Sequence, residues 1–479
     1  MTVTRSSTSV LRSAVHAPVR SAGAQRAFAT ATAGSIPVAA LNETAPVASI
    51  TVAARAGPRF EPAEGAAHAL KNFAFKSTNA RSALAIVRET ELNGGVLSAA
   101  LTKEHLLLTA DFLKGDEAYF AELLAEVLAQ SKFSPYEYKE DVIPSLAVDH
   151  EQAAQDATVS GMDALFRTAF RTRGAGNSLF ASPSAPVSLE QVKAFAKGVY
   201  NNANVAVISS GLSLSKLEGL VSQFELPAGS PVSSPPSKYF GGDFRAGIAD
   251  AHGHPLPRDH FFLAFEGAGR HASAPLSVLG SMLGGFSSVK WSRGESPLSA
   301  VSQITGASAY AFNAPLQDSG LFGLHVAAPG EKLTEAAKAA TQALDKIAQG
   351  PPSAEELNRA VANAKFLAAS DLESGRVSSH ETLAAAVRVF LCGPCLLTTC
   401  SSWTTRRCRS RKPLATSARS APTTCRRYVL LRSYFLHVLT MTGRPDAAQE
   451  HPDHGGSREP QDAAVRGRAP LKVLEAIRI

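Results

Sequence analysis

The chain has 479 residues, which is too long for one ordinary core and predicts two domains. Its 45% hydrophobic and 19% charged residues indicate a folded globular protein. The formal charge of +7 suggests an acidic partner, but residues 1–28 carry four arginines and no acid, and residues 391–479 carry 15 basic against 6 acidic residues. Residues 29–390 carry 29 basic and 35 acidic residues, so the body of the chain predicts no nucleic-acid partner.

The N-terminal segment has the composition of a mitochondrial transit peptide. It reads MTVTRSSTSVLRSAVHAPVRSAGAQRAFATATAGS, is rich in Arg, Ser and Ala, and has no acidic residue before Glu43. A basic amphipathic segment of this kind is drawn inward by the membrane potential. Because Arg26 lies three residues before Ala29, we expect a presequence at 1–28 that is cleaved between Phe28 and Ala29. The alternative is a tail without a targeting role.

The sequence contains no stretch apolar enough to cross a bilayer. A spanning helix needs about 20 consecutive apolar residues. The nearest candidate, YVLLRSYFLHVLTM, is shorter and contains Arg432. We therefore expect a protein that does not span the membrane.

Strand and helix patterns alternate through the first half. Strands are predicted from runs of small and β-branched residues, and helices from apolar spacing near 3.6. The helical pattern is strongest in DEAYFAELLAEVLAQS, whose apolar stripe consists of Phe120, Leu123, Leu124, Val127 and Leu128. Polar residues 102–104 are expected to form the turn of a strand pair. Strands are expected within 45–61, 94–113 (a pair) and 204–212, and helices within 63–75, 79–92, 116–131, 188–200 and 213–224.

A segment dense in Pro, Ser and Gly, residues 225–242, predicts an interdomain linker near the middle of the chain. Beyond it the order of elements repeats, because a strand pair within 307–329 is again followed by an amphipathic helix within 331–350. This repetition predicts two tandem homologous α+β domains, each a mainly antiparallel sheet with helices packed on it. We expect the N-terminal domain at 29–224 and an incomplete second domain at 243–390.

The last part of the chain differs in composition from everything before it. A capping box at Ser353 and Glu356 begins a helical run, but all five cysteines lie within 392–425, where Arg, Thr and Ser dominate. We interpret 391–479 as an aberrant or disordered tail that a retained intron or frameshift has introduced. The second domain would then lack its last helices and its closing strand.

Two other interpretations of the cysteines compete with the aberrant tail. Cys392 and Cys395 form the Cys-Gly-Pro-Cys sequence of a thioredoxin-type redox pair, which needs a strand before it and a long helix after it. The following LLTTCSSWTTRRCRSRKP is a poor helix. A zinc site would need a second closely spaced pair, and the remaining cysteines do not supply one: Cys400, Cys408 and Cys425.

Residues His68 to Asn72 read His-Ala-Leu-Lys-Asn and match part of the inverted zinc motif H-x-x-E-H. In that motif two His on successive turns bind zinc, and the Glu between them activates a water. Here Lys71 stands at the Glu position and Asn72 at the second His position. A charged Lys cannot accept a proton, and an Asn amide is a poor zinc ligand. We therefore expect no metal and no catalytic residue, with His68 as an ordinary helix-face histidine.

The surrounding sequence resembles the N-terminal domain of the pitrilysin-type, mitochondrial-processing-peptidase family. The stretches FAFKSTNARS, IVRETELNGG and LSAALTKEHLLLTADF carry the resemblance, which covers about residues 40–390. In the peptidases of this family a third zinc ligand, a Glu, follows further along the chain. The matching stretch here is KEDVIPSL, which places Ser145 at that position. The resemblance therefore implies a peptidase fold in which three of the four residues that carry the chemistry are replaced.

The non-peptidase members of this family include the α subunit of the processing peptidase and the core subunits of ubiquinol–cytochrome c reductase, complex III. The region that contains LGGFSSVKWS and SPLS has only short glycine pairs, where the α subunit has a long glycine-rich loop. Together with HALKNFAFKST, these stretches resemble the fungal core 2 branch. That resemblance implies a structural subunit without cofactor, peripheral to the inner membrane on its matrix side, that pairs with core protein 1 and supports cytochrome b. The alternatives are the presequence-binding α subunit, a working metallopeptidase, and a redox protein that uses Cys392 and Cys395.

Overall fold

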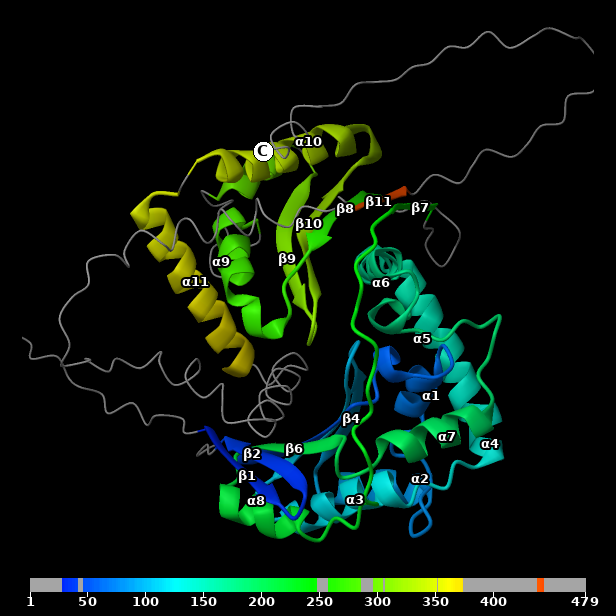
Figure 1. Ribbon diagram of the computed structural model, residues 1–479. Helices are drawn as coiled ribbons and strands as arrows, with labels where there is room; N and C mark the ends of the chain where they lie inside the picture. The colour runs from blue at the N-terminus through cyan, green and yellow to red at the C-terminus, as the bar shows by residue number, and fades with distance from the viewer. Residues whose placement is uncertain are drawn as a thin grey trace, which may run out of the picture.

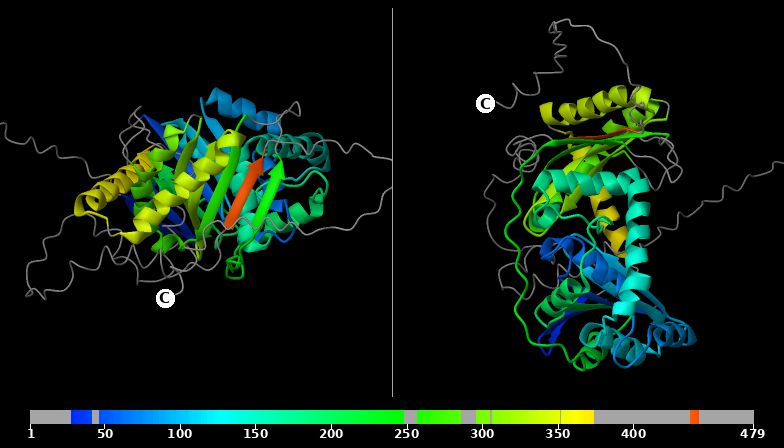
Figure 2. Two further views of the ribbon diagram at one scale, coloured as in Figure 1. Left: turned by 90° about the horizontal axis from the view of Figure 1, so that it is seen from above. Right: turned by 90° about the vertical axis from the view of Figure 1, so that its right-hand side faces the viewer.

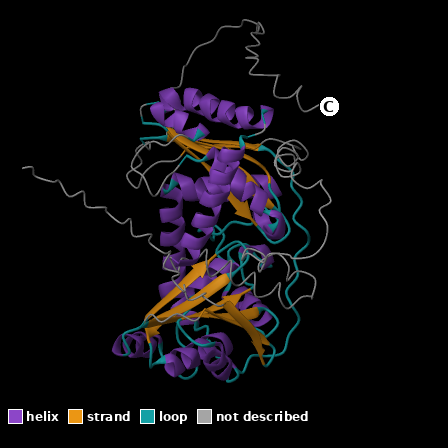
Figure 3. Cartoon of the chain, turned by 90° about the vertical axis from the view of Figure 1, so that its left-hand side faces the viewer, coloured by secondary structure: helices purple, strands orange, loops and turns teal. Residues whose placement is uncertain are grey.

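The computed structural model describes residues 28–41, 46–247, 257–285, 296–304, 306–350, 352–373 and 437–442. The chain forms two α+β halves, each built on one sheet with helices beside it (Figure 1, Figure 3), as the sequence predicts. The strands are β1 (Phe28–Ala33), β2 (Ile36–Leu41), β3 (Val47–Ala54), β4 (Val96–Leu101), β5 (Leu106–Leu113), β6 (Val205–Ser210), β7 (Asp243–Gly247), β8 (Asp259–Glu266), β9 (Ser308–Pro315), β10 (Gly320–Ala328) and β11 (His437–Thr442). The helices are α1 (Ala66–Asn72), α2 (Ala83–Leu92), α3 (Glu117–Ala129), α4 (Pro135–Glu137), α5 (Ile143–Gln155), α6 (Ala157–Phe170), α7 (Leu189–Val199), α8 (Leu214–Val221), α9 (Ala274–Leu283), α10 (Gly330–Gln349) and α11 (Ala354–Glu373).

The first sheet has the strand order β1-β2-β6-β3-β5-β4. Its neighbouring strands are antiparallel except β2 and β6, which are parallel. The predicted strand pair is β4 and β5, which face each other from Leu101 and Leu106 outward, so that residues 102–104 make the expected turn. Strands β1 and β2 were not predicted, since their Ala- and Thr-rich sequences alternate only weakly.

The second sheet repeats the arrangement of the first. Its order is β7-β11-β8-β10-β9, in which β11 is parallel to β7 and antiparallel to β8. Strand β6 has the same relation to β2 and β3 in the first sheet. The strand pair β9–β10 followed by α10 corresponds to β4–β5 followed by α3. The shared topology confirms the predicted duplication.

Strand β11 comes from the range 391–479, where no closing strand was expected. It lies between β7 and β8, at the position that β6 holds in the first sheet. Its sequence, HVLTMT, contains the β-branched and apolar residues that favour strands. The remaining residues of 391–479, including all five cysteines, lie outside the described residues. The interpretation of that range as an aberrant tail therefore stays a prediction.

The core of the first half lies between its sheet and the helices beside it. Alternate residues of β3, among them Ile50 and Val52, point into this core because successive side chains of a strand face opposite sides. Helix α3 covers the sheet with the predicted apolar stripe, all of which is buried: Phe120, Leu123, Leu124, Val127 and Leu128. In the described part of the chain, no helix is both long and apolar enough to cross a membrane.

Helices α5 and α6, which the sequence analysis did not assign, lead from the first half to the second (Figure 2). Phe166 and Phe170 of α6 pack in one buried cluster with Phe262 and Leu321 of the second sheet. Gly161 permits this approach, because a Cβ at that position would lie 2.4 Å from the Phe262 ring. Helix α6 therefore belongs to the first half by sequence but covers the second sheet.

Residues 225–242 contain no helix or strand and run along both halves, as the right-hand view of Figure 2 shows. The segment is hydrogen-bonded to both halves. Val232 N donates to Asn204 Oδ1 (2.8 Å) in the first half, and Phe240 N donates to Ala169 O (2.9 Å) on α6. The form of the segment agrees with a linker, while the domain limits 29–224 and 243–390 stay predictions.

Candidate functional site

The altered zinc motif lies on α1, a short helix whose first five residues are all buried. The residue that caps the N-terminus of the helix is Gly65, whose φ of 90° is a backbone conformation that glycine adopts readily. A Cβ on Gly65 would lie 2.7 Å from the Cβ of Ala181, so the start of α1 packs closely on that segment. Helical spacing then places His68, Lys71 and Asn72 on one face, which is directed at α5.

These three side chains converge on a single carboxylate oxygen, Oδ2 of Asp149 on α5. Lys71 Nζ donates to it at 2.8 Å, and Asn72 Nδ2 donates at 3.2 Å. His68 Nε2 lies 3.0 Å from the same oxygen. The face of α1 that would hold zinc in the H-x-x-E-H motif is therefore occupied by an ion pair and two hydrogen bonds.

The hydrogen bonds of His68 fix its tautomer. Its Nδ1 accepts from the backbone N–H of Ala181 at 3.0 Å, so the proton of the neutral ring is on Nε2 and is donated to Asp149. Burial lowers the pKa of His68, against the raising effect of Asp149, and the ring stays neutral near pH 7. For Asp149, burial alone would raise the pKa, but the hydrogen bonds from Lys71 and His68 outweigh it and lower the pKa.

These residues do not fit a zinc ion. Zinc sites use His, Cys, Asp and Glu ligands. This site offers only two such side chains, His68 and Asp149, and the ammonium group of Lys71 is bound to the same carboxylate. Across the described residues there is no group of three such side chains that could hold a metal. Lys71 Nζ is bonded to the carboxylate and, while charged, cannot take a proton from a water. The arrangement can join α1 to α5.

The structure does not bring Ser145 to this cluster. Its Oγ donates instead to the backbone carbonyl of Asp141, one turn back on the same helical run, at 2.8 Å. Asp149, one turn further along α5, is the residue that faces the altered motif. The local pattern KEDVIPSL points to Ser145 as the third-ligand position and does not reveal Asp149. A helix through 143–155 would have shown that Asp149 shares a face with Ser145.

The other residues that the sequence analysis singled out lie elsewhere. Phe28 and Ala29 are the first two residues of β1, where they pair with Leu41 and Ala40 of β2. The cleavage between them stays a prediction, and residues 1–27 lie outside the described residues. Cys392 and Cys395 also lie outside them, as do residues 286–295, which include most of the stretch LGGFSSVKWS.

Another buried carboxyl group, that of Glu61, contacts the start of α1. Glu61 Oε2 accepts from the backbone N–H groups of Gly65 (3.1 Å) and Ala67 (3.0 Å), while Oε1 is buried without a hydrogen-bond partner among the described residues. Burial raises the pKa of Glu61 to about 7, and the two backbone hydrogen bonds oppose this only in part.

We expect this carboxyl to make the protein less stable as pH rises. A pKa of about 7 in the folded chain lies above the ordinary value of 4.5. Between pH 4.5 and pH 7 the Glu61 carboxyl therefore holds a proton in the folded chain but not in the unfolded chain. The stability that this proton gives the folded chain is fully present below pH 4.5 and is lost as pH rises through 7. Between pH 5 and pH 8 the free energy of unfolding should fall by about 2 kcal/mol from this group. Urea unfolding of the wild type and Glu61→Gln at both pH values measures it.

The variant supplies the control, because the glutamine side chain cannot titrate. Glu61→Gln should remove most of this pH dependence and leave the contributions of other groups in place. An equal fall in stability for both proteins would show that Glu61 does not carry it.

The family models match two consecutive parts of the chain. Residues 37–182 match Insulinase (Peptidase family M16), and residues 186–364 match the Peptidase M16 inactive domain. Among curated relatives, the protein named cytochrome b-c1 complex subunit 2, mitochondrial, of Cryptococcus neoformans is 41% identical over 73% of this chain and 81% of its own length. The protein of that name in Neurospora crassa is 37% identical over 78% of this chain and 85% of its own length.

Solved structures agree in fold. A peptidase M16 inactive domain from Pseudomonas fluorescens superposes with a TM-score of 0.70 at 17% identity, over 88% of this chain and all of that one. A protease from Helicobacter pylori gives the same score at the same identity over 87% of this chain and 99% of its own length. The family models, the relatives and the folds agree, and the chain belongs to the M16 peptidase family, in the branch whose members are named cytochrome b-c1 complex subunit 2.

Proposed function

We propose that the protein is the structural, non-catalytic core subunit 2 of respiratory complex III. The observation that carries the proposal is the convergence of His68, Lys71 and Asn72 on Asp149, which fills the metal-binding face of α1 with an internal ion pair. A chain that has kept the peptidase fold without its chemistry is suited to a supporting role. The similarity to relatives named subunit 2 supports this role over that of the processing-peptidase α subunit.

The finer parts of the proposal concern place and partners. We infer a position on the matrix side of the mitochondrial inner membrane, peripheral to the bilayer. There the subunit would pair with core protein 1 and support the subunits that include cytochrome b. The acidic balance of 29–390 and the transit-peptide composition of 1–28 support a matrix protein rather than a nucleic-acid-binding one.

Purification from mitochondria tests the proposal. Antibody capture of the chain after mild detergent extraction should bring down cytochrome b, the Rieske protein and core protein 1 in near-equal amounts. N-terminal sequencing of the captured chain should begin at Ala29. Recovery as a soluble dimer with a zinc peptidase, and without cytochrome b, would contradict the proposal in favour of the α subunit. Peptide cleavage that depends on one bound zinc per chain would contradict both.

A further inference from the structure

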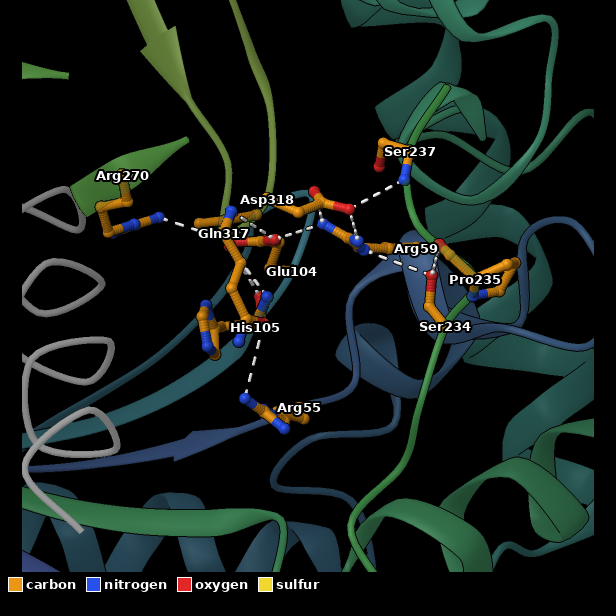
Figure 4. Close-up of polar contacts among 11 residues, drawn as sticks. Arg55, Arg59, Glu104, His105, Ser234, Pro235, Ser237, Arg270, Gln317 and Asp318 are labelled. Carbon is orange, nitrogen blue, oxygen red and sulfur yellow. Dashed lines mark hydrogen bonds and ion pairs between the residues drawn. The ribbon is translucent and has the colours of Figure 1, made fainter. Parts of the chain in front are cut away.

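A cluster of charged and polar groups joins the two halves of the molecule (Figure 4). We call it the junction cluster, and it consists of Arg59, Glu104, Ser237, Gln317 and Asp318. Arg59 lies just before α1, and Glu104 lies in the turn between β4 and β5. Gln317 and Asp318 lie in the turn between β9 and β10 of the second half, while Ser237 belongs to the segment 225–242. Four segments that are distant in sequence meet here.

Arg59 is at the centre of the junction cluster. Its guanidinium donates two parallel hydrogen bonds to Asp318, from Nη1 to Oδ1 and from Nη2 to Oδ2, both 2.7 Å long. Nη1 also donates to Glu104 Oε1 at 2.8 Å. The side chains of Arg59 and Glu104 are 5% and 2% exposed, so water and salt screen this contact little. A planar guanidinium bonded at two atoms fixes direction as well as distance.

Backbone groups complete the connection. Glu104 Oε1 accepts from the N–H of Gln317 at 2.9 Å, which ties the first half directly to the β9–β10 turn. Asp318 Oδ2 accepts from the N–H of Ser237 at 2.8 Å, and Arg59 Nε donates to Ser234 Oγ at 3.3 Å. Each carboxylate of the cluster therefore has a partner in another part of the chain.

Helix α6 also meets the second sheet through an apolar cluster. Phe166 and Phe170 meet Phe262 and Leu321 there, and apolar packing stabilises contact without strongly fixing direction. Two domains joined by a linker are expected to move relative to each other unless specific contacts prevent it. The two parallel hydrogen bonds from the buried Arg59 to Asp318, and the hydrogen bond from the Gln317 amide to the buried Glu104, are of that specific kind.

We propose that the junction cluster is a conformational lock, which holds the two halves in one fixed arrangement and prevents opening about residues 225–242. Opening would separate Arg59 from Asp318 and would leave the buried Glu104 without the Gln317 amide. The inference concerns the chain itself and does not depend on the proposed function. Asp318 stays ionised in the physiological pH range. Burial opposes ionisation of Asp318, but Arg59 and the Ser237 amide lower its pKa to about 2.

Arg59→Met tests the lock, because it keeps much of the length of the side chain and removes its charge and donors. Hydrogen exchange at the amides of Gln317 and Ser237 should become about tenfold faster, which corresponds to ~1.4 kcal/mol. Tryptic cleavage after the exposed Lys238 should accelerate by a similar factor, and the radius of gyration should increase. Exchange at the Ala181 amide, which is bonded to His68 within the first half, should stay unchanged.

Arg81→Met is the matched control. Arg81 binds Glu89 and Glu122 at 3.0 Å and also Glu126, all within the first half. The change removes an arginine that, like Arg59, binds more than one carboxylate, and it leaves the junction cluster intact. It should therefore change none of the three junction readouts.

A milder variant covers the case in which Arg59→Met does not fold. Asp318→Asn removes one charge at a partly exposed side chain and leaves Arg59 paired with Glu104, and we expect a smaller change in the same direction. Unchanged exchange at Gln317 in both variants would overturn the proposal. So would a rise at Ala181 equal to that at Gln317, which would indicate general loss of stability instead of opening.

Discussion

Replacing Lys103 by Met is expected to lower the free energy of unfolding by about 3–5 kcal/mol, because the change breaks a buried ion pair. Lys103 Nζ donates to Asp163 Oδ1 at 2.6 Å and to the carbonyl of Asn177 at 2.8 Å. Both charged side chains are 9% exposed. Without Lys103, Asp163 keeps the hydrogen bonds from Ser178 Oγ and the Leu179 amide, but its Oδ1 loses the ammonium group that balanced its charge. Urea unfolding at pH 7 measures the loss.

The ion pair of Lys76 and Asp141 offers a matched control. Its atoms lie 3.0 Å apart, but the side chains are 28% and 47% exposed. Lys76→Met should therefore change stability by less than about 1 kcal/mol. If the uncompensated charge is the cause, Asp163→Asn in the Lys103→Met background should recover part of the loss. The explanation is wrong if the Lys103 and Lys76 variants are equally stable, or if the second change lowers stability further.

Zinc binding should be restored by the triple change Lys71→Glu, Asn72→His and Asp149→Glu. The changes recreate H-x-x-E-H on α1 and put the third zinc ligand, a glutamate, on α5 at the position where Asp149 now meets the motif. We expect one zinc ion per chain with a Kd below about 1 μM, or ~−8 kcal/mol. Competition with a chromophoric chelator measures the affinity.

The ligand role of His68 is tested in the same background. Adding His68→Ala should weaken zinc binding at least about 100-fold, or ~2.7 kcal/mol. A matched triple variant with Ser145→Glu in place of Asp149→Glu should bind zinc no better than the double variant on α1 alone. If the Ser145 version binds more tightly, the assignment of Asp149 to the third position fails.

Local sequence patterns predicted much of the fold. The apolar stripe of α3, the β4–β5 pair and the helix within 188–200, which is α7, all appear where spacing and residue type placed them. The capping box of α11 at Ser353 and Glu356 is present as well. Each of these features depends on residues within a few turns of one another, which is the range over which a sequence pattern carries information.

Contacts between distant segments could not be predicted in this way. Residues 102–104 were expected to form a polar turn, and they do, but Lys103 and Glu104 are buried at 8% and 2% exposure. They are buried because α6 and the β9–β10 turn pack over them, and nothing in the local sequence indicates this. Asp149 was missed for the same reason, since its partners on α1 lie 77 to 81 residues away. Helix α5 has few buried apolar residues, so its sequence shows only a weak helical pattern of apolar residues.

The position of α6 limits how the chain can be divided. A cut within 225–242 would leave Phe166 and Phe170 uncovered on an N-terminal fragment and Phe262 and Leu321 uncovered on a C-terminal one. Neither fragment could cover its new apolar patch with its own residues, and such patches promote aggregation. The tandem duplication visible in the two sheets therefore describes how the chain is organised, while expression, refolding and turnover are expected to treat the two halves as a single unit.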